Sequence, residues 1–209
     1  MRQLFFAVLF APLVVFASGD ELRLDSANID PHDAISIQRG ARVFVNYCLN
    51  CHSANSMRYN RLTDLGLTEQ QIEENLLFTA GKVGDPMTIS ASRKDQRLWF
   101  GVEPPDLSVI ARSRGTDWLY TYLRTFYRDE KSPTGWNNLA FPNVGMPHAL
   151  WQLQGSQVLK IESEEHEGRK VEHKKLVLEH PGSLSTLEYD KLTRDLVNFL
   201  SYMGEPEKT

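Results

Sequence analysis

The sequence lacks the features of disulfide-rich, membrane-spanning and nucleic-acid-binding proteins. Only two of its 209 residues are cysteines, which excludes a disulfide framework. After residue 16, no apolar run approaches the ~20 residues of a membrane-spanning helix. The formal net charge of −4 argues against a nucleic-acid partner and is compatible with a cationic protein partner. The remaining composition is that of an ordinary globular protein, with one domain or one domain plus an insertion.

The N-terminus has the pattern of a secretory signal. Arg2 precedes an apolar run over residues 4–16, and small residues follow at 17–19. A basic start, an apolar core and small residues at the cleavage site are typical of signal peptides. We therefore predict that residues 1–17 are removed and that the mature chain begins near Ser18. An uncleaved anchor is the alternative, although the run is short for a bilayer.

The two cysteines lie in the motif Cys48-Leu49-Asn50-Cys51-His52. Residues three apart share a face of a helical turn, so both thiols can reach one porphyrin edge and form thioethers to its vinyl groups. His52 then presents its imidazole to the iron. This is the attachment pattern of c-type haem, and bacteria attach such haem outside the cytoplasm, in agreement with the signal. A redox or structural C-x-x-C pair is the alternative, but it gives His52 no role.

A helix is predicted immediately before the motif. Apolar residues recur on one face from about Ala34 to Tyr47, and Asp33 or Ser36 can cap the start. Gly40 is costly inside a helix. It indicates either a second helix that crosses there at close range or a tolerated surface position.

A matching helix is predicted near the C-terminus. Ser185 and Glu188 form a capping box, an apolar face extends to Met203, and Gly204 ends the helix. A haem-bearing helix crossed by an aromatic-rich C-terminal helix is the arrangement of class I cytochromes c. The predicted fold class is therefore mainly α, a class I cytochrome c-like haem domain with long loops.

The middle of the chain is predicted to contain shorter elements. Thr68 caps a helix over residues 68–78, residues 79–101 form a loop, and Thr116 caps a further helix with an aromatic stripe. The segment 152–184 contains β-prone runs and is predicted to be a small hairpin-like insertion. It also holds solvated charges (Glu162, Glu164, Glu165, Glu167) and three histidines for which a metal site is the less favoured alternative (His166, His173, His180).

A bound iron needs a sixth ligand or an open position. Met146 lies in the stretch 141–148, where two prolines and a glycine favour a stiff loop that can hold a thioether without a large ordering cost. A thioether opposite histidine is a ligand pair of high-potential cytochromes c. His148 in the same loop and Met87 are the rival ligands, and core packing is the alternative role of Met146.

Four stretches together point to one family. They are residues 40–54 around the haem motif, Pro104-Pro105-Asp106-Leu107-Ser108, residues 111–119, and residues 141–147. With them the sequence resembles the cytochrome c1 family, above all its proteobacterial members, over most of the chain. The second and third stretches are far more specific than the haem motif, which many cytochromes share.

The resemblance implies one covalently attached haem c. Arg114 matches the arginine that meets a haem propionate, while Pro104 and Pro105 would stiffen the pocket wall beside the haem. The attachments implied are thioethers at Cys48 and Cys51, a proximal ligand at His52 and a distal ligand at Met146.

The resemblance also implies a function. The family comprises the electron-carrying haem subunits of the cytochrome bc1 complex (ubiquinol–cytochrome c reductase), which are not enzymes on their own. With cytochrome b, the chain would lie on the periplasmic side of the bacterial inner membrane. It would accept one electron from the Rieske iron–sulfur protein and pass it to a soluble c-type cytochrome. A free periplasmic monohaem shuttle and a peroxidase-like haem enzyme with an open sixth position are the alternatives.

One feature of the family is missing from the sequence. Family members continue into a C-terminal membrane helix, whereas this sequence stops at residues 205–209, where that helix would begin. We expect truncation at this junction. Residues 18–209 would then be the haem domain, with residues 152–184 as its insertion.

Overall fold

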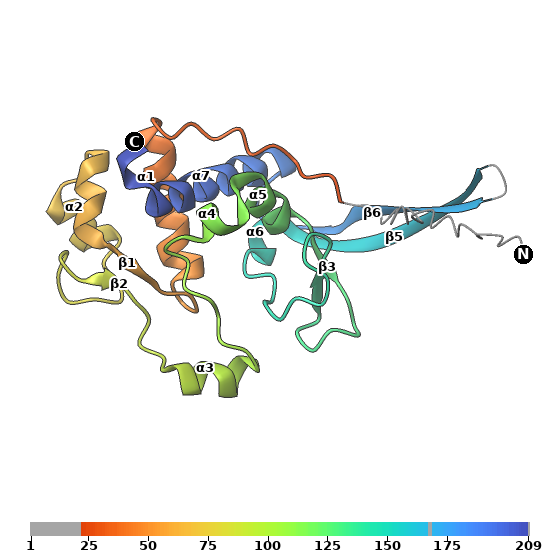
Figure 1. Cartoon of the computed structure of the whole chain (residues 1–209), viewed down its shortest axis with the longest axis horizontal. Helices are drawn as coiled ribbons and strands as arrows, with labels where there is room; N and C mark the ends of the chain where they lie inside the picture. The colour runs from red at the N-terminus through yellow and green to blue at the C-terminus, as the bar shows by residue number, and fades with distance from the viewer. Residues whose placement is uncertain (1–21, 167–168, 209) are drawn as a thin grey trace, which may run out of the picture.

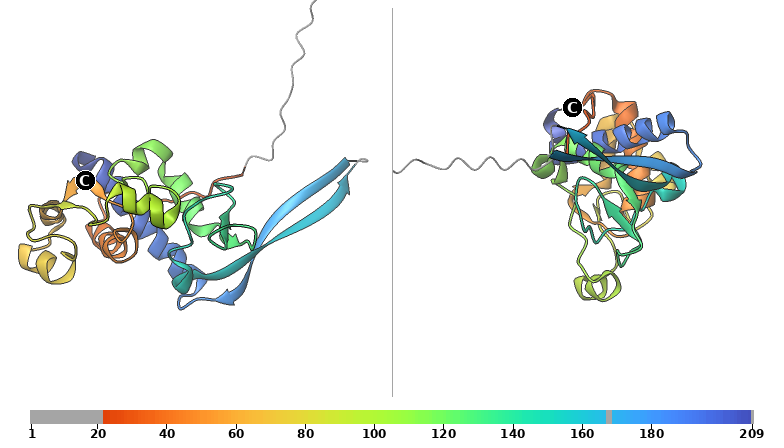
Figure 2. Two further views of the ribbon diagram at one scale, coloured as in Figure 1. Left: turned by 90° about the horizontal axis from the view of Figure 1, so that it is seen from below. Right: turned by 90° about the vertical axis from the view of Figure 1, so that its right-hand side faces the viewer.

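The computed structural model describes residues 22–166 and 169–208, so the predicted signal peptide (residues 1–17) lies outside the described part. A helical body carries a long two-stranded hairpin that projects from one end (Figures 1 and 2). The prediction of a mainly α domain with long connections and a hairpin insertion is confirmed.

The elements follow one another along the chain with short or irregular connections. The helical elements are α1 (Ala34–Val43), the π-helix η1 (Phe44–Cys48), the 3₁₀ segment η2 (Tyr59–Leu65), α2 (Glu69–Asn75), α3 (Arg93–Phe100), α4 (Ile110–Arg114), α5 (Thr116–Arg124), α6 (Trp151–Gln154), α7 (Thr186–Gly204) and η3 (Pro206–Lys208). The strands are β1 (Ala54–Arg58), β2 (Pro86–Met87), β3 (Phe126–Arg128), β4 (Trp136–Asn138), β5 (Gly155–His166) and β6 (Arg169–Pro181).

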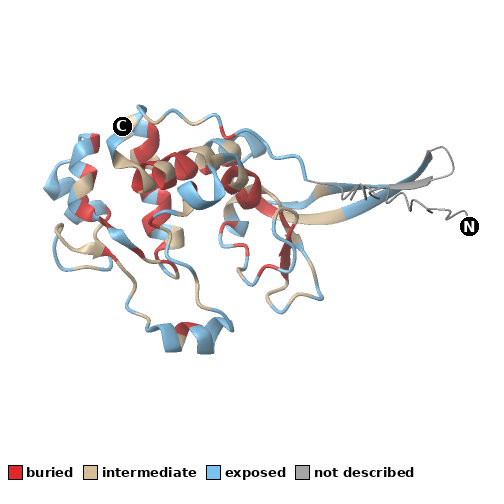
Figure 3. Ribbon diagram, viewed as in Figure 1, coloured by how far each residue is buried: buried red, intermediate tan, exposed pale blue. Residues whose placement is uncertain are grey.

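The core centres on the crossing of α1 and α7, where buried residues are concentrated (Figure 3). A Cβ atom at Gly40 would lie 2.0 Å from the carbonyl oxygen of Asp195 and 2.7 Å from Cβ of Phe199. The Phe44 and Phe199 rings meet beside this point with centroids 5.4 Å apart. The crossing helix predicted at Gly40 is therefore confirmed, and the surface alternative is wrong.

Polar side chains complete the same crossing. Asp195 is only 5% exposed, and its carboxylate accepts hydrogen bonds from Ser36 Oγ at 2.7 Å and Arg39 Nε at 2.5 Å. Asn198 donates to Ser36 Oγ at 3.1 Å. Asp33 caps α1 by accepting from the Ser36 amide at 2.9 Å, so of the two predicted caps Asp33 is the one used. The buried carboxylate is compensated by several donors, as its desolvation requires.

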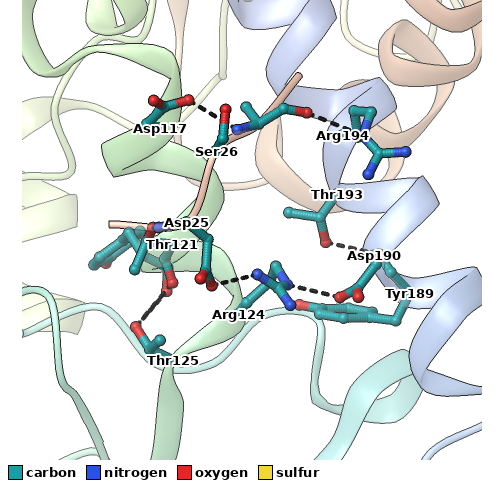
Figure 4. A network of polar contacts seen from close by, with 12 residues as sticks. Asp25, Ser26, Asp117, Thr121, Arg124, Thr125, Tyr189, Asp190, Thr193 and Arg194 are labelled. Carbon is teal, nitrogen blue, oxygen red and sulfur yellow. Dashed lines mark hydrogen bonds and ion pairs between the residues drawn. The ribbon is translucent and has the colours of Figure 1, made fainter. Parts of the chain in front are cut away.

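An arginine on α5 ties the N-terminal segment to the helices (Figure 4). The Arg124 guanidinium contacts the Asp25 carboxylate at 2.6 Å and the Asp190 carboxylate on α7 at 2.6 Å. The amide of Asp25 also donates to Thr121 Oγ1 at 2.8 Å. The polar, extended N-terminal segment is thus held by directed contacts.

The shorter helices show where local signals succeed and fail. The capping box of Thr68 and Gln71 is present, although α2 ends at Asn75 instead of Phe78. The prediction of a loop over residues 79–101 is wrong in part, because α3 forms there with Ser92 as its cap. The prediction that Thr116 caps the next helix is wrong. Thr116 is the first residue of α5, after Gly115 at φ +84°, and the short helix α4 precedes it.

The insertion is a longer hairpin than the sequence predicted. Strands β5 and β6 pair from Gly155↔Pro181 to His166↔Arg169 and extend the β3–β4 pair, giving the order β4-β3-β5-β6. Gly155 has φ +95°, and a Cβ there would lie 2.2 Å from the His180 carbonyl oxygen, so the root of the hairpin needs glycine.

The two hairpin histidines whose side chains are described lie too far apart to bind one metal ion together. His173 and His180 are exposed and lie seven residues apart on one strand, which separates them by about 23 Å. The side chain of His166 lies outside the described part. No group of three potential metal-binding side chains is found among the described residues. Within the same part of the chain, no helix combines the length and apolarity needed to cross a bilayer.

The helix crossing leads to a stability prediction. Gly40→Ala should lower the free energy of unfolding by about 3 kcal/mol, because the new Cβ meets backbone atoms of α7 that cannot move independently. Denaturant unfolding followed by circular dichroism would measure the change. Gly84→Ala is the matched control, since nothing lies within 4 Å of its Cβ position, and it should cost less than about 0.5 kcal/mol. Equal stability of the two variants would contradict the close crossing.

Candidate haem-binding site

The motif follows α1 without a break, through the π-helix η1 that ends at Cys48. The helix widens into η1, where the Leu49 amide donates to the Phe44 carbonyl at 2.9 Å, five residues back. The amides of Cys51 and His52 then both donate to the Cys48 carbonyl, at 3.1 and 2.8 Å. A single wide turn of this kind is frequent at functional sites. Here it brings both thiols and the imidazole into one short segment.

His52 is fixed in one orientation by the Pro-Pro-Asp-Leu-Ser loop. Its Nδ1 lies 2.7 Å from the carbonyl oxygen of Pro105. A carbonyl can only accept, so Nδ1 carries the proton and Nε2 keeps a free lone pair. The side chain is 9% exposed, and burial lowers the pKa of His52, which favours this neutral form. The arrangement suits a metal ligand whose second nitrogen is held by a backbone carbonyl.

The same loop is joined to the residues that follow the motif. The Leu107 amide donates to the Ser53 carbonyl at 2.8 Å, and the Asn55 amide donates to Asp106 Oδ2 at 2.8 Å. The Ser56 amide donates to Ser108 Oγ at 3.0 Å. The loop was predicted to form a pocket wall through proline stiffness. Its position also depends on these hydrogen bonds, for which the sequence carried no signal.

Both thiols are free in the fold. Burial raises the pKa of Cys48 to about 12, with a smaller contribution from the nearby Cys51, and burial also raises the pKa of Cys51. Both groups are therefore protonated thiols at neutral pH.

The Met146 loop is positioned from β4. Asn137 Oδ1 accepts from the Asn143 amide at 2.8 Å, while Asn138 Oδ1 accepts from the amides of Ala140 at 2.8 Å and Phe141 at 3.1 Å. These bonds shape the loop on its N-terminal side. Met146 itself is partly buried.

Two contacts connect the Met146 loop to its surroundings. A Cβ at Gly145 would lie 3.3 Å from Val102 Cγ2, so this loop meets the segment that leads into Pro105. Tyr122 on α5 donates its hydroxyl proton to Met146 Sδ at 3.3 Å. From its sequence spacing, Tyr122 was predicted only to pack in an aromatic stripe. That spacing carries no information about a hydrogen bond to Met146.

The rival ligands occupy packed positions. His148 is 2% exposed, its ring stacks on Phe126 with centroids 4.8 Å apart, and it meets Trp136 edge-on at 5.1 Å. Burial lowers the pKa of His148 to about 4, so it is neutral. Met87 is fully buried and pairs with Ala54 between β1 and β2.

Arg114 lies at the end of α4, close to aromatic rings. Its guanidinium carbon is 5.0 Å from the centroid of Trp118 and 5.7 Å from that of Phe141. No carboxylate of the described residues forms an ion pair with it, whereas Arg112 is 3.8 Å from Glu205. Arg114 thus keeps its hydrogen-bond donors available beside the Met146 loop.

The donor set and its surroundings fit a haem. The imidazole with a free nitrogen and the thioether are borderline and soft ligands suited to iron in a porphyrin, and the two thiols suit covalent attachment of the macrocycle. Large apolar side chains are exposed on the segments that flank Pro105 and Met146, and a porphyrin is an apolar ligand large enough to cover several of them. They include Leu98 (77% exposed), Trp99 (63%), Val102 (50%) and Phe141 (43%).

Comparisons with known proteins agree on one family. Residues 26–158 match the model of the Cytochrome C1 family. A protein of Nitrosomonas europaea named ammonia monooxygenase gamma subunit is 52% identical over 206 residues, which are 99% of this chain and 84% of the relative. Cytochrome c1 of Allochromatium vinosum is 49% identical over 209 residues, 99% of this chain and 86% of the relative. A mitochondrial cytochrome c1 of Arabidopsis thaliana is 27% identical over 197 residues, which cover 86% of this chain and 59% of the relative.

The thiol environment leads to a reactivity prediction. In the folded, haem-free chain at pH 8, iodoacetamide should alkylate Cys51 several-fold faster than Cys48, because the thiolate is the nucleophile and Cys48, with a pKa of about 12, forms very little of it. The difference should shrink as the pH is raised toward that value. Peptide mass spectrometry over time would measure both rates. Alkylation in guanidinium, where the two rates should agree, is the control, and equal rates in the folded chain would contradict the prediction.

Proposed function

Because this chain belongs to the cytochrome c1 family, the electron-carrying haem subunits of the cytochrome bc1 complex, we propose that it carries single electrons through one covalently attached haem c. The observation that supports this most directly is the orientation of His52. Its Nδ1–H is directed at the Pro105 carbonyl, 2.7 Å away, and its Nε2 is left free within a C-x-x-C-H motif. A bound haem supplies a one-electron iron couple, and the protein supplies attachment, ligands and surroundings.

Each site residue has a distinct role in this proposal. Cys48 and Cys51 hold the macrocycle by thioethers, His52 Nε2 is the proximal ligand, and Met146 Sδ is the distal ligand. His52 Nε2 and Met146 Sδ would together hold the iron, which would leave no position for a substrate. The chain is therefore an electron carrier and carries out no bond chemistry of its own.

Arg114 is proposed to meet a haem propionate. A partly buried carboxylate needs a cation and directed donors, and the planar guanidinium provides both. Support comes from its lack of an ion-pair partner in the described part and from the rings of Trp118 and Phe141, which restrict its guanidinium.

The proposed partners follow from the family. The chain takes one electron from the Rieske iron–sulfur protein and gives it to a soluble c-type cytochrome, next to cytochrome b on the periplasmic side of the inner membrane. The predicted signal over residues 1–17 supports export.

Isolation from membranes tests the assignment to a complex. Native protein tagged at the chromosomal locus should co-purify with a b-type cytochrome and an iron–sulfur protein after mild detergent extraction. A free shuttle would be isolated alone from the soluble periplasmic fraction. The Nitrosomonas relative is named as a monooxygenase subunit, so recovery with a monooxygenase in place of the b-type cytochrome would overturn the bc1 assignment. An abundant unrelated periplasmic protein with the same tag is the control.

The distal ligand is tested by substitution. Haem-loaded protein should give a low-spin spectrum with a weak near-infrared sulfur–iron band, and Met146→Leu should abolish that band. The midpoint potential should fall by on the order of 0.1 V or more, since axial ligands set haem potentials over about 0.8 V. Optical spectroscopy and redox titration measure both. Met87→Leu is the matched control and should retain the band. If Met87→Leu loses the sulfur–iron band while Met146→Leu retains it, the distal ligand is Met87.

A further inference from the structure

We propose that Tyr122 is a positioning residue whose hydroxyl holds the Met146 thioether and raises the electron affinity of the site. This inference rests on the proposed role of Met146 as the distal ligand. It concerns a contact between two side chains that lie 24 residues apart in the sequence.

The contact is a directed hydrogen bond. Tyr122 Oη lies 3.3 Å from Met146 Sδ, and Met146 is the partner of this hydroxyl within the described part of the chain. The Tyr122 residue is 9% exposed. A buried hydroxyl without a partner is unfavourable, so the thioether sulfur satisfies this largely buried donor.

The ring of Tyr122 is held from two sides. It stacks on Trp118 with centroids 4.9 Å apart and an interplanar angle of 10°, and it meets Phe126 at 5.0 Å and 68°. Trp118 lies one helical turn earlier on the same face of α5. The direction of the hydroxyl is therefore determined by packing before any ligand binds.

A buried asparagine connects the tyrosine to the loop that carries the methionine. Asn138 is fully buried and donates its Nδ2 proton to the Tyr122 carbonyl at 2.7 Å. The Oδ1 of Asn138 accepts from the amides of Ala140 and Phe141. The same side chain thus links the backbone of Tyr122 to the start of the loop that carries Met146.

The chemical consequence follows from the two lone pairs of the sulfur. One pair can bind a metal while the other accepts the Tyr122 proton. The hydrogen bond withdraws electron density from the sulfur and weakens its donation. Because the oxidised metal depends more on that donation than the reduced metal does, the bond favours the reduced state and raises the midpoint potential.

Tyr122→Phe in the complete, haem-loaded protein tests this inference, since it removes the hydroxyl and keeps the ring. At a fixed potential, the ferrous-to-ferric ratio should fall by about threefold to tenfold, the larger value corresponding to about 59 mV in the midpoint potential. The sulfur–iron band should persist with a shifted maximum. Tyr202→Phe is the matched control, because it also removes the hydroxyl of a buried tyrosine, which donates to the Arg61 carbonyl at 2.8 Å, and it should leave both readouts unchanged.

Several outcomes would overturn the inference. If Tyr122→Phe changes neither readout while Met146→Leu abolishes the band, the hydroxyl has only a packing role and the proposed function stands. If Met146→Leu retains the band, the ligand assignment and this inference fail together.

A second measurement keeps the test valid if Tyr122→Phe does not mature. Unaltered protein produced in D₂O carries a deuterated hydroxyl, and resonance Raman spectroscopy should then show a shift of the iron–sulfur vibration relative to protein produced in H₂O. No shift would overturn the inference.

Discussion

The backbone contact between α1 and α7 is the constraint on which the site depends. Without a side chain at Gly40, the helices approach until the Asp195 carbonyl oxygen occupies the space that a Cβ would need. From this contact α1 continues through the π-turn to Cys48 with no flexible connection. The crossing therefore determines where both thiols and His52 lie. The buried carboxylate of Asp195 adds direction to the contact, because its donors come from α1.

The other walls of the site are loops held by hydrogen bonds. The carbonyl of Pro105 orients His52, and Asn138 shapes the start of the Met146 loop while it also binds α5. A site of this kind needs ligands whose positions are set in advance by a supporting shell of hydrogen bonds. Loops of proline, asparagine and aspartate can supply that shell, because their polar groups are directed at backbone groups of neighbouring segments.

Helix α5 links this shell to the rest of the molecule. On one side, Arg124 joins the N-terminal segment and α7 through Asp25 and Asp190. On another, Trp118 and Tyr122 lie one turn apart and contact each other next to the Met146 loop. In a chain whose only two cysteines belong to the haem motif, such long-range polar and aromatic contacts take the place of disulfide bonds. The position of the thioether is thus coupled to the packing of the whole helical body.

The sequence by itself determined the C-x-x-C-H motif, the caps of α2 and α7, and the family, because each depends on residues that are neighbours along the chain. For Gly40 it left a helix crossing and a surface position open, and for the start of α1 it offered either Asp33 or Ser36 as the cap. The rest was decided by the tertiary structure. Helix α3, the full length of the hairpin, the Pro105 carbonyl as partner of His52 and the Tyr122 contact were not predicted. Helix α3 is a local element capped by Ser92, and the polar composition of its first turn concealed it. The other three depend on which separate segments meet, and hydrogen bonds between segments many residues apart leave no periodic pattern in the sequence.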